Sequence, residues 1–155
     1  LITVPLLMVE FYLILRAITA VSGGVFWRLM IGTVVMLAAG YMGEAGYINT
    51  MLGFVVGMVG WAYILYEIFL GEAGKVAAEK APASVQSAFS TMRWIVTIGW
   101  AIYPLGYFMG YFGGLGVEES ANALNIIYNL ADVLNKIAFG VIIWNVAVTE
   151  SDASK

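Results

Sequence analysis

The sequence predicts an all-α membrane protein, with five transmembrane helices forming a single domain over residues 1–155. Of the 155 residues, 62% are hydrophobic, whereas soluble domains are about half apolar. The apolar residues gather in five segments, each near or above the roughly 20 residues that a helix needs to cross a bilayer. Strand-like alternation is absent from them, and a helix satisfies its own backbone hydrogen bonds in lipid.

The first three predicted helices cover residues 1–21, 26–42 and 48–70. Pro5 is expected to break the first helix, which the Ser-Gly-Gly sequence at 22–24 closes. A short turn at residues 43–46 separates the second and third helices. Glu44 in this turn is interpreted as a loop charge, although it could belong to an exit route for protons. Glu67 lies near the end of the third helix and is expected to be solvated.

The fourth predicted helix covers residues 84–112 and is long enough to be tilted or to extend beyond the membrane. A polar loop at 71–82 precedes it, and Ser84 is the expected N-cap directly after Pro82. A glycine-rich stretch at 113–116 ends this helix. The fifth helix is predicted over residues 120–148, followed by a polar tail at 149–155.

Basic residues are divided unequally between the two sides of the predicted bundle. Six of the seven Lys and Arg residues fall on one side, and the seventh, Lys136, lies inside a helix. Cytoplasmic loops carry an excess of Lys and Arg, so we expect the side with the C-terminus to be cytoplasmic. The six residues are Arg16, Arg28, Lys75, Lys80, Arg93 and Lys155.

The composition also excludes several classes of site. The chain has no cysteine and no histidine, which rules out disulfides and removes the commonest metal ligands and the usual general base. We therefore expect no metal site. The net charge is −3 without a basic stripe, so no nucleic-acid partner is expected. The chain begins at Leu1 without a signal peptide, and we expect that part of the protein lies upstream.

Two charged residues occur inside the predicted helix that contains residues 125–144. Asp132 and Lys136 are four residues apart and so share one helix face, which Asn125, Tyr128 and Asn129 continue. A charge inside a membrane costs several kcal/mol and is usually paired or functional. One interpretation is a structural ion pair. The other is a reactive lysine with its counterion, since burial disfavours the ammonium and a neutral amine condenses with a carbonyl to form a Schiff base.

Glu10 is the corresponding feature of the first predicted helix. Its neighbours are apolar, and a carboxyl in such surroundings stays protonated until a nearby group becomes basic. At 1.5 Å per residue it lies roughly 10 Å along the helix from Thr3. The alternative is a carboxyl that is hydrogen-bonded to a neighbouring helix.

Several residues could line a pocket between the helices. Trp100, Tyr103 and Tyr107 share a face of the fourth helix, although such a stripe alone more often reflects packing. Pro104 between them would bend the helix and free a carbonyl, and we expect it to act as a hinge. On the second and third helices the candidates are Met36, Gly40 and Trp61.

The combination of these segments resembles the microbial rhodopsins, and among them the proteorhodopsins. The matching segments read TVPLL at 3–7, EFYL at 10–13, GYMGEAG at 40–46, WAIYPLGY at 100–107 and IYNLADVLNK at 127–136. The resemblance extends over essentially the whole chain. It implies a seven-helix bundle in which the five helices here are the third to the seventh.

The resemblance also implies a cofactor and a role for each candidate residue. Lys136 would bind all-trans retinal covalently as a Schiff base, with Asp132 as a counterion and Glu10 as the proton donor. A leucine at Leu7 goes with green absorption in the family and a glutamine with blue. The implied pocket consists of Thr3, Leu7, Met36, Gly40, Trp61, Trp100, Tyr103, Pro104 and Tyr107.

The implied function is a light-driven outward proton pump of the bacterial inner membrane, an ion transporter rather than an enzyme. Its partners would be retinal, protons, the lipid bilayer and further copies of the chain. The family's primary proton acceptor is an aspartate that would precede Leu1, so a sodium pump of the same fold remains an alternative. A retinal-based photosensor and a non-photoactive helix bundle are the others.

Overall fold

The computed structural model describes residues 2–112 and 117–153, and within these ranges the regular structure is entirely helical. This confirms the predicted fold class. The elements are α1 (Thr3–Ile18), α2 (Gly23–Glu44), α3 (Thr50–Phe69), α4 (Glu72–Lys80), α5 (Ala83–Trp94), the π-helical η1 (Ile95–Gly99), α6 (Trp100–Phe112) and α7 (Val117–Ala153).

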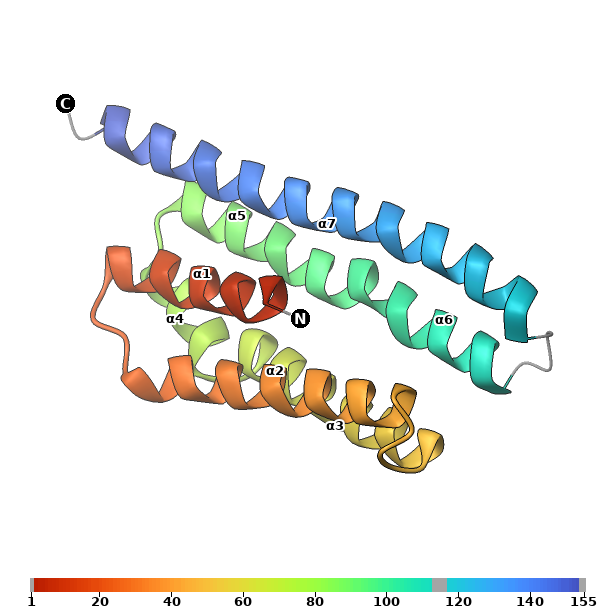
Figure 1. The fold of residues 1–155 in the computed structure, drawn as a ribbon. Coiled ribbons are helices and arrows are strands. Elements are labelled where there is room, and N and C mark those ends of the chain that lie inside the picture. The colour runs from red at the N-terminus through yellow and green to blue at the C-terminus, as the bar shows by residue number, and fades with distance from the viewer. Residues whose placement is uncertain (1, 113–116, 154–155) are drawn as a thin grey trace.

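The helices run roughly along one axis, as Figure 1 shows. The α2–α3 pair forms one side, and α1 lies between this pair and the two long rods on the other side. One rod is the continuous series α5–η1–α6 and the other is α7. The end of α1, the start of α2, α4, the start of α5 and the end of α7 meet at one end, here called the basic end because it carries Arg16, Arg28, Lys75 and Lys80.

Four helical stretches among the described residues are long and apolar enough to cross a membrane. They cover Gly23–Glu44, Thr50–Lys80, Ala83–Phe112 and Asn125–Asp152. The remaining predicted span, at residues 1–21, corresponds to α1, which has 16 residues. Figure 1 shows that α1 begins part-way along the bundle. The bundle is therefore that of a multi-pass membrane protein.

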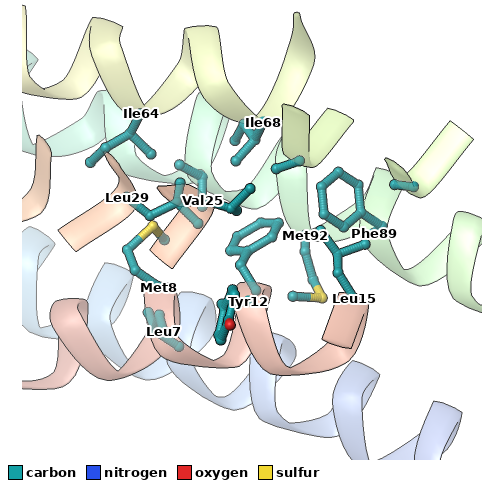
Figure 2. Close-up of a cluster of buried hydrophobic side chains, with 14 of the residues drawn as sticks. Leu7, Met8, Tyr12, Leu15, Val25, Leu29, Ile64, Ile68, Phe89 and Met92 are labelled. Atoms are coloured by element: carbon teal, nitrogen blue, oxygen red, sulfur yellow. The ribbon is translucent and has the colours of Figure 1, made fainter. Parts of the chain in front are cut away.

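The core gathers around α1, as Figure 2 shows for several of its side chains. Phe11 is fully buried, and its ring makes edge-to-face contacts with Phe89 at 5.3 Å and with Phe139 at 5.2 Å between centroids. Leu15 and Leu29 are also inaccessible. Since Phe11 reaches both rods, α1 positions them relative to the α2–α3 pair.

Glycines bring α2 and α3 into close contact. A Cβ at Gly60 would lie 2.7 Å from Met36 N, and one at Gly53 would lie 2.7 Å from Ala39 O. Real Cβ atoms essentially never approach so closely, so these positions need glycine. Small residues that let backbones approach are typical of helix pairs in membranes.

The prediction of a polar loop at residues 71–82 was wrong, because α4 (Glu72–Lys80) covers most of this range. The carboxylate of Glu67 helps to stabilise the start of α4. Its Oε1 accepts a hydrogen bond from Ala73 N at 3.1 Å, which satisfies a backbone donor in the first turn of this helix. Ala73 and Ala77 are buried in the core. The expected solvation of Glu67 was wrong as well, since only 1% of this residue is exposed.

Arg28 provides the charge that keeps Glu67 buried. Its Nε lies 2.8 Å from Glu67 Oε2, and its Nη2 donates to Glu72 Oε2 at 2.7 Å. Ser22 Oγ completes the network by donating to the same Glu72 oxygen at 3.0 Å. A carboxylate buried in membrane helices needs such partners, and here they come from the start of α2.

Three expected helix boundaries also differ. Pro5 does not break α1 but lies in its first turn, where a missing N–H is tolerated. Pro82, not Ser84, is the N-cap residue of α5, and the Ser84 hydroxyl instead donates to the carboxylate of Glu150. The expected polar tail is helical up to residue 153, and Thr149 Oγ1 bonds to Asn145 O at 2.8 Å.

Candidate functional site

A cavity of about 610 Å³ lies between the helices in the half of the bundle away from the basic end. Its walls come from the start of α1, the end of α2, the start of α3, and facing parts of α6 and α7. The lining includes every pocket residue expected from the resemblance, together with Asp132 and Lys136. The expected pocket residues on this surface are Thr3, Leu7, Met36, Gly40, Trp61, Trp100, Tyr103, Pro104 and Tyr107.

Lys136 and Asp132 form an ion pair in the wall of this cavity. Lys136 Nζ lies 2.5 Å from Asp132 Oδ2, and the Tyr103 hydroxyl donates to Asp132 Oδ1. Tyr128 supports Tyr103, since the two rings stack at 5.5 Å with an interplanar angle of 29° and Tyr128 Oη donates to Tyr103 O at 3.0 Å. The carboxylate is thereby fixed between an ammonium and a phenol.

The remaining wall is mostly apolar and aromatic. Phe54 stacks on Tyr107 with centroids 5.6 Å apart and an interplanar angle of 20°. Gly40 lines the cavity, and a Cβ built there would meet nothing within 4 Å. An apolar cavity of a few hundred Å³ with a few convergent polar groups is typical of a small-molecule site.

The π-helical segment η1 passes beside this cavity and is held by two side chains from other helices. Trp61 Nε1 donates to Val96 O at 3.0 Å, and Asn135 Nδ2 donates to Gly99 O at 3.1 Å. Both donors line the cavity. Single π turns inside α-helices are frequent at functional sites.

Glu10 is not part of the cavity wall. It lies on α1 one turn beyond Leu7, in the direction of the basic end. Its Oε2 is buried and has no hydrogen-bond partner among the residues that the structure describes. Glu44, the last residue of α2, is exposed and lines the mouth of the cavity, so the structure is compatible with both interpretations of this residue.

Sequence reasoning assigned no role to several residues of the wall. Asn125 and Tyr128, expected on the face of Asp132, do line the cavity, whereas Asn129 is not part of this wall. Asn135 was not singled out, because its position directly before Lys136 does not reveal a contact with Gly99 across 36 residues. Phe54 was not singled out either, because it lies on a different helix from Asp132 and Lys136 and no spacing relates it to them.

No group of three or more acidic side chains suited to a metal ion occurs in the described ranges. The polar groups of the cavity wall include one amine, from Lys136, two carboxylates, from Asp132 and Glu44, and several phenols and amides. An amine held beside a carboxylate can carry a covalently attached carbonyl compound, with the carboxylate stabilising the positive charge on nitrogen.

A bundle of membrane helices around a cavity with one paired lysine agrees with the family that the sequence segments resemble, and comparison with known proteins supports this class. The family model for bacteriorhodopsin-like proteins matches residues 1–150. The chain therefore belongs to the bacteriorhodopsin-like family, a membership that also confirms the resemblance noted from the sequence.

Within this family the chain is similar to proteorhodopsins. It is 56% identical over 151 residues to the green-light absorbing proteorhodopsin of Gamma-proteobacterium EBAC31A08 and 55% identical over 152 residues to the blue-light absorbing proteorhodopsin of Gamma-proteobacterium Hot 75m4. Both alignments cover 97% of this chain and 59% of the relative. The chain thus spans about three fifths of the length of these relatives.

Solved structures agree with this placement. The blue light-absorbing proteorhodopsin from Med12 superimposes with a TM-score of 0.76 at 50% identity, covering 96% of this chain and 64% of that chain. The rhodopsin of Exiguobacterium sibiricum gives a TM-score of 0.84 at 36% identity, covering 97% and 69% respectively. The arrangement of helices around the cavity is therefore that of microbial rhodopsins.

Proposed function

We propose that this chain forms the retinal-binding part of a light-driven outward proton pump. The observation that carries the proposal is that Lys136, paired with Asp132 at 2.5 Å, lies in the wall of an apolar cavity of about 610 Å³. The cavity suits a long apolar aldehyde, because its polar groups converge at the lysine and Gly40 leaves open space. The light-absorbing relatives named above support the same assignment.

Retinal bound to Lys136 Nζ would supply the absorption of visible light and a bond rotation that moves the nitrogen and its proton. The protein residues have separate tasks around that nitrogen. Asp132 stabilises its positive charge, and Tyr103 fixes one carboxylate oxygen through a hydrogen bond. Leu7, Trp100 and Met36 exclude water from the apolar part of the cavity.

Glu10 is the residue proposed to return the proton. An ionised carboxylate whose buried oxygen has no partner would be costly inside a membrane, so the protonated acid is the favoured resting form of Glu10. Its place between the cavity and the basic end allows it to deliver a proton to Lys136 and be refilled from that end. A protonatable donor has no use in an anion pump.

The proposed direction of proton transport follows from the distribution of basic residues. The basic end carries Arg16, Arg28, Lys75 and Lys80, and basic ends face the cytoplasm. Glu10 then supplies protons from inside, and protons leave through the end of the cavity at Glu44. The pump would lie in the inner membrane of a bacterium with the C-terminus in the cytoplasm.

Light-induced pH changes in cells test this proposal. The complete reading frame that contains this chain would be expressed with all-trans retinal, in unbuffered salt solution under green light. External acidification that a protonophore abolishes is the expected result. Passive alkalinisation that grows with the protonophore would identify another transported ion, such as sodium, and so overturn proton pumping.

The remaining alternatives give different results in the same cells. A visible absorption band without any pH change would favour a photosensor. Failure to form a band with retinal, while the protein accumulates in the membrane, would leave the Asp132–Lys136 pair as a structural feature of a non-photoactive bundle.

A further inference from the structure

The contact between Asn135 and Gly99 has a geometry that the proposed pump does not explain. Asn135 Nδ2 donates to Gly99 O at 3.1 Å. A Cβ at position 99 would overlap the Asn135 amide, with Cγ at 2.9 Å and Oδ1 closer still. The amide thus lies against the backbone of the rod, and this approach requires a glycine at 99.

The contact lies where the helical rod is least regular. Gly99 is the last residue of η1, whose closing hydrogen bond runs from Trp100 N to Ile95 O. Five residues further along, Pro104 has no N–H to give to the carbonyl of Trp100. A π turn followed by a proline weakens the backbone ladder, and helices kink at such places.

The same contact marks a boundary between the two rods. On the cavity side, Tyr103 and Tyr128 join α6 to α7 through hydrogen bonds. Toward the basic end, the next side-chain hydrogen bond between these rods in the described residues is that of Ser84 with Glu150. Between Gly99 and Ser84 the rods meet through apolar packing of residues such as Val85 and Val146.

We propose that Asn135 is a positioning residue whose amide, bound to the Gly99 carbonyl, holds η1 closed against α7, and that this bond sets how long the two rods stay apart once light has displaced Lys136. Asn135 directly precedes Lys136, so a displacement of the lysine is transmitted through one peptide unit to the bond. This inference rests on the proposed function, since light supplies the displacement.

The principal test replaces the amide by a branched side chain of similar size, Asn135→Leu. Asn145→Leu is the matched control, because Asn145 is an exposed residue of the same helix. The chain has no cysteine, so Ser87→Cys on α5 and Ala147→Cys on α7, both exposed, provide the only spin-label sites within it. The complete protein with retinal is used throughout.

Two readouts separate the hydrogen bond from general damage. In the dark, the ¹³C shift of the Gly99 carbonyl should move to the value of an unbonded carbonyl in Asn135→Leu and stay unchanged in Asn145→Leu. After a flash, the open population measured by the label distance should persist about three- to tenfold longer, which is the effect of one net hydrogen bond on an equilibrium. Asn145→Leu should recover as the parent does.

A second pair of variants tests the proposal independently, in case Asn135→Leu does not fold. Gly99→Ala should lower the yield of pigment because of the overlap with Asn135. Adding Asn135→Ala removes the overlap, so the double variant should regain the yield of pigment. Its open population should still persist longer than that of the parent, as in Asn135→Leu. Restored yield with parental recovery would overturn the proposal.

The outcomes also distinguish this proposal from the proposed function. An unchanged Gly99 carbonyl shift in Asn135→Leu, or parental recovery despite a changed shift, overturns the role of Asn135 even where the pump works. A changed shift and a changed label distance in a protein that shows no light-driven pH change would support the role of Asn135 and reject the pump.

Discussion

Arg28 Nε lies 2.8 Å from Glu67 Oε2, which joins the start of α2 to the end of α3 through a carboxylate that is almost completely buried. The other oxygen of Glu67 accepts from Ala73 N at the start of α4. One side chain therefore joins three helices at the basic end.

Replacing Glu67 should destabilise this end of the bundle. Glu67→Ala removes both the partner of Arg28 and the backbone acceptor for Ala73. Loss of a buried charged partner typically costs about 3–5 kcal/mol of the free energy of unfolding. The expected cost lies at the lower limit of this range, because Arg28 keeps its hydrogen bond to Glu72. Thermal unfolding in detergent measures the change. Glu72→Ala is the control, since Glu72 is more exposed, and an equal loss in both variants would contradict the assignment.

Gly60 should also be intolerant of substitution, for a steric reason. In Gly60→Ala the new Cβ would lie 2.7 Å from Met36 N and 2.9 Å from Gly32 O, so the α2–α3 pair must separate. Overpacking of this kind costs about 1–3 kcal/mol, measured as a lower unfolding temperature.

Gly140→Ala is the matched control for this change. Gly140 lies inside α7 with nothing within 4 Å of its Cβ position, so alanine should be neutral or should stabilise by about 0.5–1 kcal/mol through helix propensity. Comparable destabilisation by both alanines would show that the close approach of α2 and α3 is not the cause.

The helices could be predicted from the sequence because apolar length is a local signal, whereas the cavity wall was predicted from the resemblance to a family. Apolar length located the helices, and the matching segments around Trp100 and Lys136 located residues that the fold then brings to one cavity. Interactions between distant residues gave no such signal. Glu67 was expected to be solvated because it lies near a helix end, and nothing local indicated its partner Arg28, 39 residues away. Likewise, no periodicity reveals that Trp61 and Asn135 donate hydrogen bonds to carbonyls of η1.

Leu7 should influence the colour of the pigment. Its side chain lines the cavity, and Leu7→Gln would place a dipole beside the bound chromophore. From the family resemblance we expect absorption at a shorter wavelength, moving from green toward blue. Overall identity does not decide the colour, since green- and blue-absorbing relatives are 56% and 55% identical to this chain.

The visible spectrum of the purified pigment measures this effect. Leu6→Gln is the control, because Leu6 is the neighbouring residue and is 53% exposed on the outside of α1. It should leave the absorption maximum unchanged. A parental spectrum in Leu7→Gln would show that this part of the cavity does not contact the chromophore.

Glu10→Gln should slow the return of the proton to Lys136. The amide is nearly the same size but cannot donate a carboxylic proton, and a positioned acid contributes about 10²–10⁴-fold to such a transfer.

Without this donor, protons must come from the solution, so the recovery rate of Glu10→Gln after a flash should fall about tenfold for each unit of increasing pH. In the parent, one Glu10 oxygen is buried without a hydrogen-bond partner among the described residues, and we propose that this carboxyl is protonated in the dark, so the recovery of the parent should depend much less on pH. Flash photolysis between neutral and alkaline pH measures both slopes, and Glu79→Gln, an exposed residue of α4, serves as the control. Parental kinetics in Glu10→Gln would identify another donor, whereas slow but pH-independent recovery would mean that the substitution hinders a structural step instead of proton transfer.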